Sequence, residues 1–191
     1  MTARRSSEAP RRTTLLPDAP EDRTAEVVIY VVGHTDSSQL GKTKLNKVMW
    51  HADVLHYRRY GKTITGQESY ARLQNGPVPN GIYEVLRKLK DNGALAERHV
   101  PTPGGVRHEL FNLVQPDPSW FDSAEVETLY EAMSFITRMS AKQASDNTHG
   151  PIWEELRNKE QMSIRAASVI PSEVRPEEIE MALENADAFK V

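Results

Sequence analysis

Residues 43–61 of this chain read TKLNKVMWHADVLHYRRYG. Core-forming side chains recur there at the spacing of one helix face, at Leu45, Val48, Met49, Ala52, Leu55 and His56. Polar and cationic side chains fall on another face, at Lys44, Lys47, His51 and Arg58. Gly61 is a natural stop, because glycine readily adopts the left-handed conformation that ends many helices. The pattern predicts an amphipathic helix over residues 43–60 with one face in the core.

The segment before this helix, residues 22–34, is apolar over most of its length and rich in valine and isoleucine. β-Branched residues favour strands. The length and polar flanks of the segment also fit a buried helix, and periodicity does not separate the two structures. Both alternatives stay open on local sequence alone.

After the helix, residues 63–74 are expected to be extended. Residues 75–80 read NGPVPN and predict a rigid turn, because proline excludes helix and Asn-Gly favours positive φ. Asn80 is a candidate cap for a helix that follows to about residue 90. The apolar stripe of that helix comprises Ile82, Val85, Leu86 and Leu89.

The second half of the chain predicts a β-hairpin and then more helices. Residues 94–100 and 106–114 flank a Pro- and Gly-rich loop of five residues, which is typical of a hairpin. Asp122 and Glu125 form an N-cap pair for a long helix to about residue 146. A short helix around Trp153 follows. Together these elements predict an α+β fold, mainly α-helical: a compact helical domain with a small β-hairpin or sheet.

The two ends differ from this body, which we assign to residues 22–170. Residues 1–21 carry four arginines and several prolines but few apolar residues, which predicts a disordered basic tail. Residues 172–191 hold six carboxylates against two cations. With Pro176 and three glutamates at its start, this stretch predicts an acidic C-terminal helix over residues 171–191, packed on the domain or extending it.

Composition narrows the class of protein. The 191 residues suffice for one compact domain, and the net charge of −3 shows no basic excess of the kind that nucleic acid demands. The chain has no cysteine, which excludes disulfides, thiolate zinc sites and cysteine nucleophiles. No apolar run approaches the roughly 20 residues of a membrane span. We therefore expect a cytoplasmic protein without a membrane partner.

The chain shows no pattern that specifies catalysis or a cofactor. Gly41-Lys42-Thr43 resembles the end of a phosphate-binding loop, but Asp36 stands where that loop needs its first glycine. The Gly-x-Ser-x-Gly elbow of a hydrolase nucleophile is missing from the sequence. The sequence predicts no catalytic residue, no cofactor and no enzyme activity.

The histidines predict no metal site. His51 and His56 lie about 140° apart around a helix and do not share an ion easily. His99 and His108 can face each other across the hairpin, but the sequence reveals no cluster of further ligands near them.

DNA binding is an alternative that the residues permit. The helix near 80–90 followed by the hairpin has the order of a recognition helix and wing in a winged-helix domain. Five cations lie on these elements, but four carboxylates reduce the net charge of residues 82–109 to +1. A solvated helix beside a hairpin is the favoured interpretation.

A cluster of tyrosine and arginine indicates a protein-binding surface, because these residues are enriched at interface hot spots. The candidate residues are Tyr57, Arg58, Arg59 and Tyr70, joined by the turn of Asn75, Gly76, Pro77, Val78, Pro79 and Asn80.

Three blocks of sequence resemble the Panacea family of SocA-like antitoxins. The first runs from Lys44 to Asp53 and continues through His56-Tyr57 and Tyr60-Gly61-Lys62, with Trp50 in place of the usual Tyr or Phe. The second is the Gly-Pro-Val-Pro of residues 76–79, and the third is Thr148-His149 shortly before Trp153. The resemblance covers roughly residues 25–160.

The resemblance implies an antitoxin that neutralises a cognate toxin, encoded beside it, by direct binding. It also implies a helix over residues 25–33, which we follow against the local strand propensity, and it supplies no catalytic residue. Two alternative functions remain: an adaptor that delivers the toxin to a AAA+ protease, and a winged-helix-like DNA-binding autoregulator.

Overall fold

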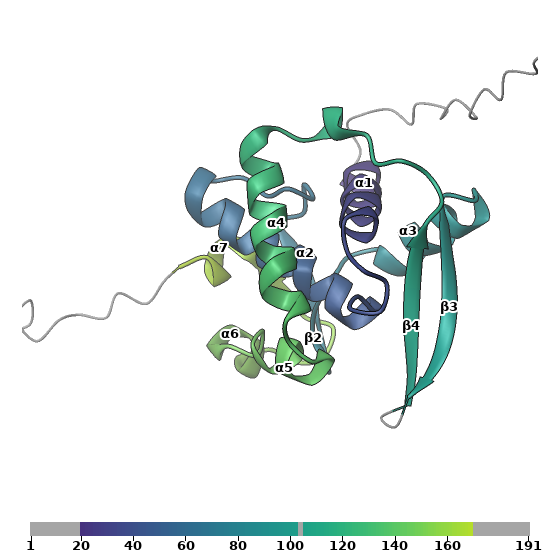
Figure 1. Ribbon diagram of the computed structural model, residues 1–191. Coiled ribbons are helices and arrows are strands. Elements are labelled where there is room, and N and C mark those ends of the chain that lie inside the picture. Colours follow the sequence, from purple (N-terminus) through teal and green to yellow (C-terminus); the bar gives the residue numbers. More distant parts are fainter. Residues whose placement is uncertain (1–19, 103–104, 170–191) are drawn as a thin grey trace, which may run out of the picture.

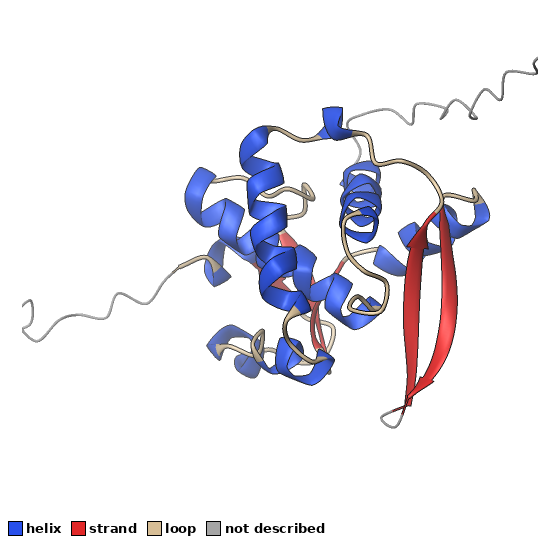
Figure 2. Ribbon diagram, in the orientation of Figure 1, coloured by secondary structure: helices blue, strands red, loops and turns tan. Residues whose placement is uncertain are grey.

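The computed structural model describes residues 20–102 and 105–169. Its helices are α1 (Pro20–Gly33), α2 (Lys42–Tyr60), α3 (Ile82–Asp91), the 3-10 turn η1 (Pro118–Trp120), α4 (Ser123–Thr137), α5 (Ala141–Asp146), α6 (Pro151–Glu155) and α7 (Ile164–Ala167). Its strands are β1 (Ser69–Leu73), β2 (Gly76–Pro79), β3 (Leu95–Thr102), β4 (Gly105–Asn112) and β5 (Gln161–Ser163). The prediction of a mainly helical α+β fold is confirmed (Figures 1 and 2).

Helix α2 is the central element and confirms the predicted helix. It contacts α1, α4, α5, α7, β2 and β4 (Figure 1). Residues 44–50 of this helix are all buried, and even Lys44, Asn46 and Lys47 are withdrawn from solvent. The spacing separated the two lysines from the apolar stripe but did not predict their burial, since periodicity cannot show that other elements cover their face.

Helix α1 resolves the ambiguity of the apolar segment in favour of the helix that the family resemblance implies. Val27, Val28, Ile29 and Val31 are all inaccessible to solvent. The helix packs against α2, α3 and β4. Burial on several sides outweighs the preference of β-branched residues for strands, which reflects packing context more than the backbone itself.

The prediction of a rigid turn at residues 75–80 is wrong for its central part. Residues 76–79 form β2, which pairs with β1 in an antiparallel sheet of order β2-β1-β5. Asn80 does not cap α3, whose N-cap is Gly81 with φ of 71°. The Asn80 side-chain amide instead donates to the Ser69 carbonyl of β1 and to Gln161 Oε1 of β5, which ties the end of β2 to the other two strands of the sheet.

The predicted hairpin is confirmed as β3 and β4, which project from one side of the helical body (Figure 1). Pairing continues to Thr102 and Gly105, so the connection is shorter than the predicted five-residue loop. His99 and His108 are direct partners in the register, as the sequence suggested.

The long helix predicted to residue 146 is divided in two. Asp122 and Glu125 form the predicted capping box at the start of α4. However, α4 ends at Thr137, and a second capping box of Ser140 and Gln143 starts α5. The Ser140 hydroxyl oxygen accepts a hydrogen bond from the backbone N–H of Gln143 at 3.2 Å. It thereby satisfies a backbone donor of the first helical turn that would otherwise lack a partner.

We expect Ser140→Ala to lower the free energy of unfolding by about 1 kcal/mol, the usual value of an N-cap side chain. Chemical denaturation of the wild type and the variant measures the difference. Ser134→Ala, an exposed position within α4, is the matched control and should be neutral or slightly stabilising. Equal losses in both variants would show that the cap contributes nothing specific.

Two predicted segments, residues 1–19 of the basic tail and 171–191 of the acidic helix, lie outside the described residues and stay predictions. Within the described residues, none of the helices is both long and apolar enough to cross a membrane.

Candidate functional site

The predicted arginines lie at the exposed end of α2. Arg58 donates from Nε to the Ser168 carbonyl at 3.1 Å. Arg59 makes two hydrogen bonds to the Glu131 carboxylate of α4, at 2.8 and 3.2 Å, which raise the Arg59 pKa above its ordinary value. Tyr57, by contrast, is half-buried against the core. The structure therefore keeps Arg58 and Arg59 on the surface and withdraws much of Tyr57.

A stacked aromatic pair extends this surface along α2 and α4. The His51 and Phe135 rings stack with their centroids 4.7 Å apart. His51 lies two helical turns before Arg58, and Phe135 lies one turn after Glu131, so the two pairs share one side of the helices. We call His51, Arg58, Arg59, Glu131 and Phe135 the α2–α4 face.

Neither Phe135 nor Tyr130 of α4 was predicted from the sequence to lie on the surface. The structure leaves the Tyr130 side chain 47% exposed. The centroids of the Tyr130 and His34 rings lie 5.7 Å apart, and both residues line an open pocket of about 290 Å³. Tyr130 and Phe135 are thus exposed aromatic residues on a helix that also supplies core residues. This excess of large apolar residues over one helix face was visible in the sequence.

Tyr70 does not belong to the surface, which corrects its predicted role. The side chain is fully buried, and its hydroxyl donates to Asp53 Oδ2 at 2.8 Å. Asp53 also accepts the Ile64 and Thr65 amide protons, at 2.7 and 3.0 Å, and the Thr65 hydroxyl proton. Burial raises the pKa of Asp53 to about 6, against the opposing effect of these hydrogen bonds. This cluster fixes the loop after α2 to strand β1.

The predicted turn is also largely buried. Gly76, Pro77, Val78 and Pro79 are covered as parts of β2, and only Asn75 and Asn80 at its ends are exposed. The prediction that residues 76–79 form an exposed binding surface is therefore wrong. The reason is that β2 packs against α2, a contact far apart in sequence.

The three sequence blocks that resemble the Panacea family meet around Lys47. Its Nζ donates to the Pro77 carbonyl at 3.1 Å. A Cβ atom at Gly76 would lie 2.5 Å from both Lys47 Nζ and Thr148 Oγ1, so only glycine fits, and its φ of 96° points to the same conclusion. Burial lowers the pKa of Lys47 to about 7.

A stack of rings continues this cluster toward the surface. His149 stacks on Trp153 with centroids 3.7 Å apart, and the Arg72 guanidinium lies 3.7 Å from the Trp153 ring centroid. Trp153 donates from Nε1 to the Leu73 carbonyl at 3.1 Å. Burial, followed by the charge of Lys47, lowers the pKa of His149. The cluster holds α2, the β1–β2 sheet and the α5–α6 segment together.

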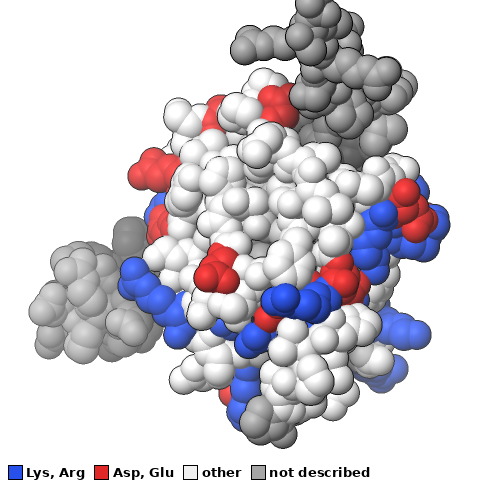
Figure 3. Space-filling model, turned by 45° about the vertical axis from the view of Figure 1, so that its right-hand side comes forward, with Lys and Arg blue, Asp and Glu red and all other residues white. Residues whose placement is uncertain are grey.

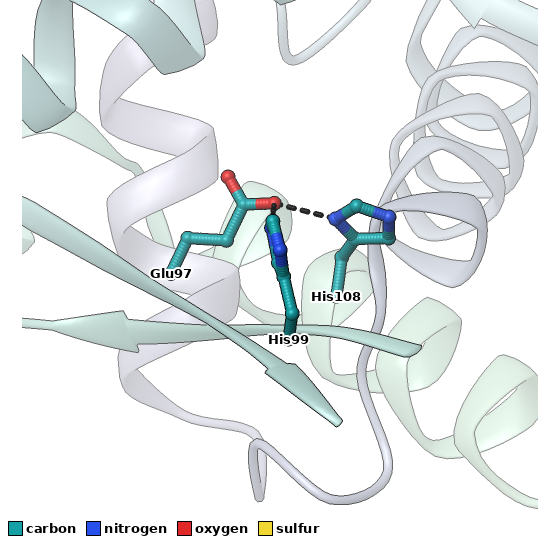
Figure 4. Close-up of side chains that lie close together, drawn as sticks. All are labelled: Glu97, His99 and His108. Carbon is teal, nitrogen blue, oxygen red and sulfur yellow. Dashed lines mark hydrogen bonds and ion pairs between the residues drawn. The ribbon is translucent and has the colours of Figure 1, made fainter. Parts of the chain in front are cut away.

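A second polar cluster lies on the hairpin, around the Glu97 carboxylate (Figure 4). His108 and His99 lie 2.6 and 3.1 Å from Glu97 Oε1. Lys42 contacts the same oxygen at 2.6 Å, and Lys90 contacts Oε2 at 2.8 Å. Burial opposes ionisation of Glu97, but these donors hold its pKa well below the ordinary value. The expectation that no further ligand lies near the two histidines is corrected, because Glu97 joins them.

The cations on which the DNA-binding alternative rests are mostly paired with carboxylates. Arg87 contacts Glu84 and Asp91, both at 2.6 Å. Arg98 and Arg107 both contact Glu109, at 2.6 and 2.5 Å. Figure 3 shows Lys and Arg interleaved with Asp and Glu on the face that it presents. Such pairing weakens the positive potential that phosphate binding requires.

These features define a small, mainly helical α+β protein whose deepest polar clusters join segments distant in sequence. The antitoxin SocA-like, Panacea domain family matches residues 45–154, more than half of the chain, and the protein belongs to this family. No curated protein and no solved structure matches the chain.

Proposed function

We propose that the protein neutralises a cognate toxin in the cytoplasm by binding it directly, without catalysis. Membership of the antitoxin family is the observation that carries this proposal. The family match supports an antitoxin role in general. The surface chemistry of the described residues is the basis for choosing direct binding.

We propose the α2–α4 face as the toxin-binding surface. It combines two exposed arginines with a partly exposed phenylalanine, 38% accessible, in a continuous strip. Arginine is enriched at interface hot spots, where it supplies contact area together with charged hydrogen bonds. Phenylalanine is enriched in interfaces and supplies apolar contact area. The Arg59–Glu131 pair and the His51–Phe135 stack hold the strip in shape before a partner arrives, which lowers the entropic cost of binding.

The first experiment expresses the product of the neighbouring open reading frame, alone and together with this protein. Growth arrest by the neighbour and rescue by co-expression support an antitoxin role. Isolation of a complex of the two purified proteins supports direct binding. If the neighbour disappears faster in cells only while a AAA+ protease is active, the adaptor alternative replaces simple neutralisation. Salt-sensitive binding to the promoter, with no toxin complex, would favour the DNA-binding autoregulator.

The Arg58→Ala/Phe135→Ala double variant tests the surface. We expect its affinity for the toxin to fall about 10-fold or more, as for hot-spot residues. Its melting temperature should stay within about 2–3 °C of the wild type, because Arg58 is exposed and Phe135 is partly exposed and lies outside the hydrophobic core cluster. Titration calorimetry and thermal unfolding measure the two quantities.

Tyr83→Ala is the matched control, because Tyr83 is an aromatic on α3 that is 65% exposed. It should bind the toxin like the wild type. Unchanged binding by the double variant would exclude the α2–α4 face. A large fall in melting temperature would show that the two residues serve the fold instead.

A further inference from the structure

Three potential metal ligands lie on one face of the β3–β4 hairpin. Glu97 and His99 are two residues apart on β3, so their side chains point to the same face. His108 is the direct cross-strand partner of His99, which places it on that face too. Arg98 and Glu109, which alternate with these residues, pair with each other. Strand alternation therefore places both histidines on the same face as Glu97 and places the Arg98–Glu109 pair on the opposite face.

One ring nitrogen of each histidine already points toward the same oxygen of the Glu97 carboxylate (Figure 4). Glu97 Oε1 lies 2.6 Å from His108 Nδ1 and 3.1 Å from His99 Nε2, and all three atoms lie within 4.8 Å of one another. Two ligands bound to zinc at about 2.1 Å in a tetrahedron lie about 3.4 Å apart. Small side-chain movements on a fixed backbone would bring these atoms to that separation.

The donor set is two imidazole nitrogens and one carboxylate oxygen, which suits Zn²⁺. The side chains of His99 and His108 are 62% and 39% exposed, so an ion has access from solvent. Three protein ligands leave a fourth position for water or for a group on a partner. We propose that Glu97, His99 and His108 form a binding site for Zn²⁺.

Two lysines contact the Glu97 carboxylate, and one of them competes with the ion. Lys42 contacts Oε1, the oxygen that faces the histidines, whereas Lys90 contacts Oε2. Zinc must therefore displace Lys42, whose side chain is 30% exposed and free to turn toward solvent. Lys90 can keep its contact with the other oxygen. This arrangement makes an unusual prediction: removal of Lys42 should strengthen zinc binding.

Titration calorimetry with Zn²⁺ alone tests the site on the untagged, full-length protein, in a buffer that does not coordinate metals. We expect saturable binding of one ion per chain at this site. Glu97→Gln should weaken binding at least about 10-fold, since even residues that only support a ligand contribute that much. His99→Asn/His108→Asn should abolish binding. Lys42→Ala should tighten binding relative to the wild type.

His34→Asn is the control, because His34 is exposed and lies outside the cluster; it should bind like the wild type. Circular dichroism confirms that each variant is folded. The proposal is overturned if the wild type takes up no zinc, if the double histidine variant still binds it, or if Lys42→Ala does not bind more tightly. Loss of binding in His34→Asn would place the ion elsewhere and would also overturn it.

Discussion

The Asp53→Ala variant is expected to lose at least about 3 kcal/mol of its free energy of unfolding. The Asp53 carboxylate accepts protons from two backbone amides and from the hydroxyls of Thr65 and Tyr70, all within the core. Alanine would leave these four donors without their partner, and each buried unsatisfied group costs about 1–3 kcal/mol. Urea unfolding followed by circular dichroism measures the loss.

Two variants make this experiment specific. Tyr70→Phe removes one donor and leaves the other three bonds, so its cost should be about 1 kcal/mol. Asp91→Ala changes an exposed carboxylate whose partner is Arg87, and it should alter stability by no more than about 0.5 kcal/mol. If Asp53→Ala were as mild as Asp91→Ala, the buried cluster would not hold the loop after α2 in place.

The second large effect is a dependence of stability on pH that comes from Lys47. Its pKa is about 7 in the folded protein, whereas an unfolded lysine has a pKa of about 10.4. Between these values the unfolded chain binds a proton that the folded chain does not. The free energy of unfolding must therefore rise with pH, by up to about 1.4 kcal/mol per pH unit for this group. Below pH 7 the folded protein holds the Lys47 amine in its charged form, and the full free-energy cost of removing that charge from water lowers the stability.

Lys47→Met isolates this contribution, because methionine keeps much of the volume and carries no charge. We expect the variant to be more stable than the wild type at pH 6 and to lose this advantage as the pH rises toward 10. Urea unfolding at several pH values gives the difference directly. Loss of the hydrogen bond to the Pro77 carbonyl shifts the difference by a constant amount and leaves its slope with pH unchanged.

Lys142→Met serves as the control, since Lys142 is 84% exposed. Its difference from the wild type should be nearly flat over the same range. A flat difference for Lys47→Met as well would contradict the burial-induced lowering of the Lys47 pKa.

Much of the secondary structure followed from local signals. The apolar spacing of residues 45–56 identified α2, and two segments that flank a Pro- and Gly-rich connection identified the hairpin. The Asp122–Glu125 pair marked the start of α4. Each signal works within a few residues, because a helix or a turn satisfies most of its own backbone hydrogen bonds locally. The break between α4 and α5 was not predicted, although Ser140 and Gln143 are a capping-box pair comparable to Asp122 and Glu125.

The candidate sites also combine features that local sequence predicts with features that depend on tertiary packing. The facing of His99 and His108 followed from the hairpin, and Glu97 could have been added from strand alternation alone. The burial of Tyr70 and of residues 76–79 could not, because it depends on where α2 meets later segments of the chain. Asp53 meets Tyr70, 17 residues further along, and Lys47 meets Pro77, 30 residues further along.

By itself, the sequence determined the fold class, most of the elements and, through three short blocks, the resemblance to the antitoxin family. Only the tertiary structure decided that Lys47 is buried, that Gly76 and Thr148 lie beside it, and that Phe135 joins the arginines of α2 on the surface. The physical reason is that periodicity reports which face of an element is apolar, whereas burial depends on which distant surfaces meet. Several partners cover α2, so its sequence pattern alone could not reveal where its polar side chains would lie.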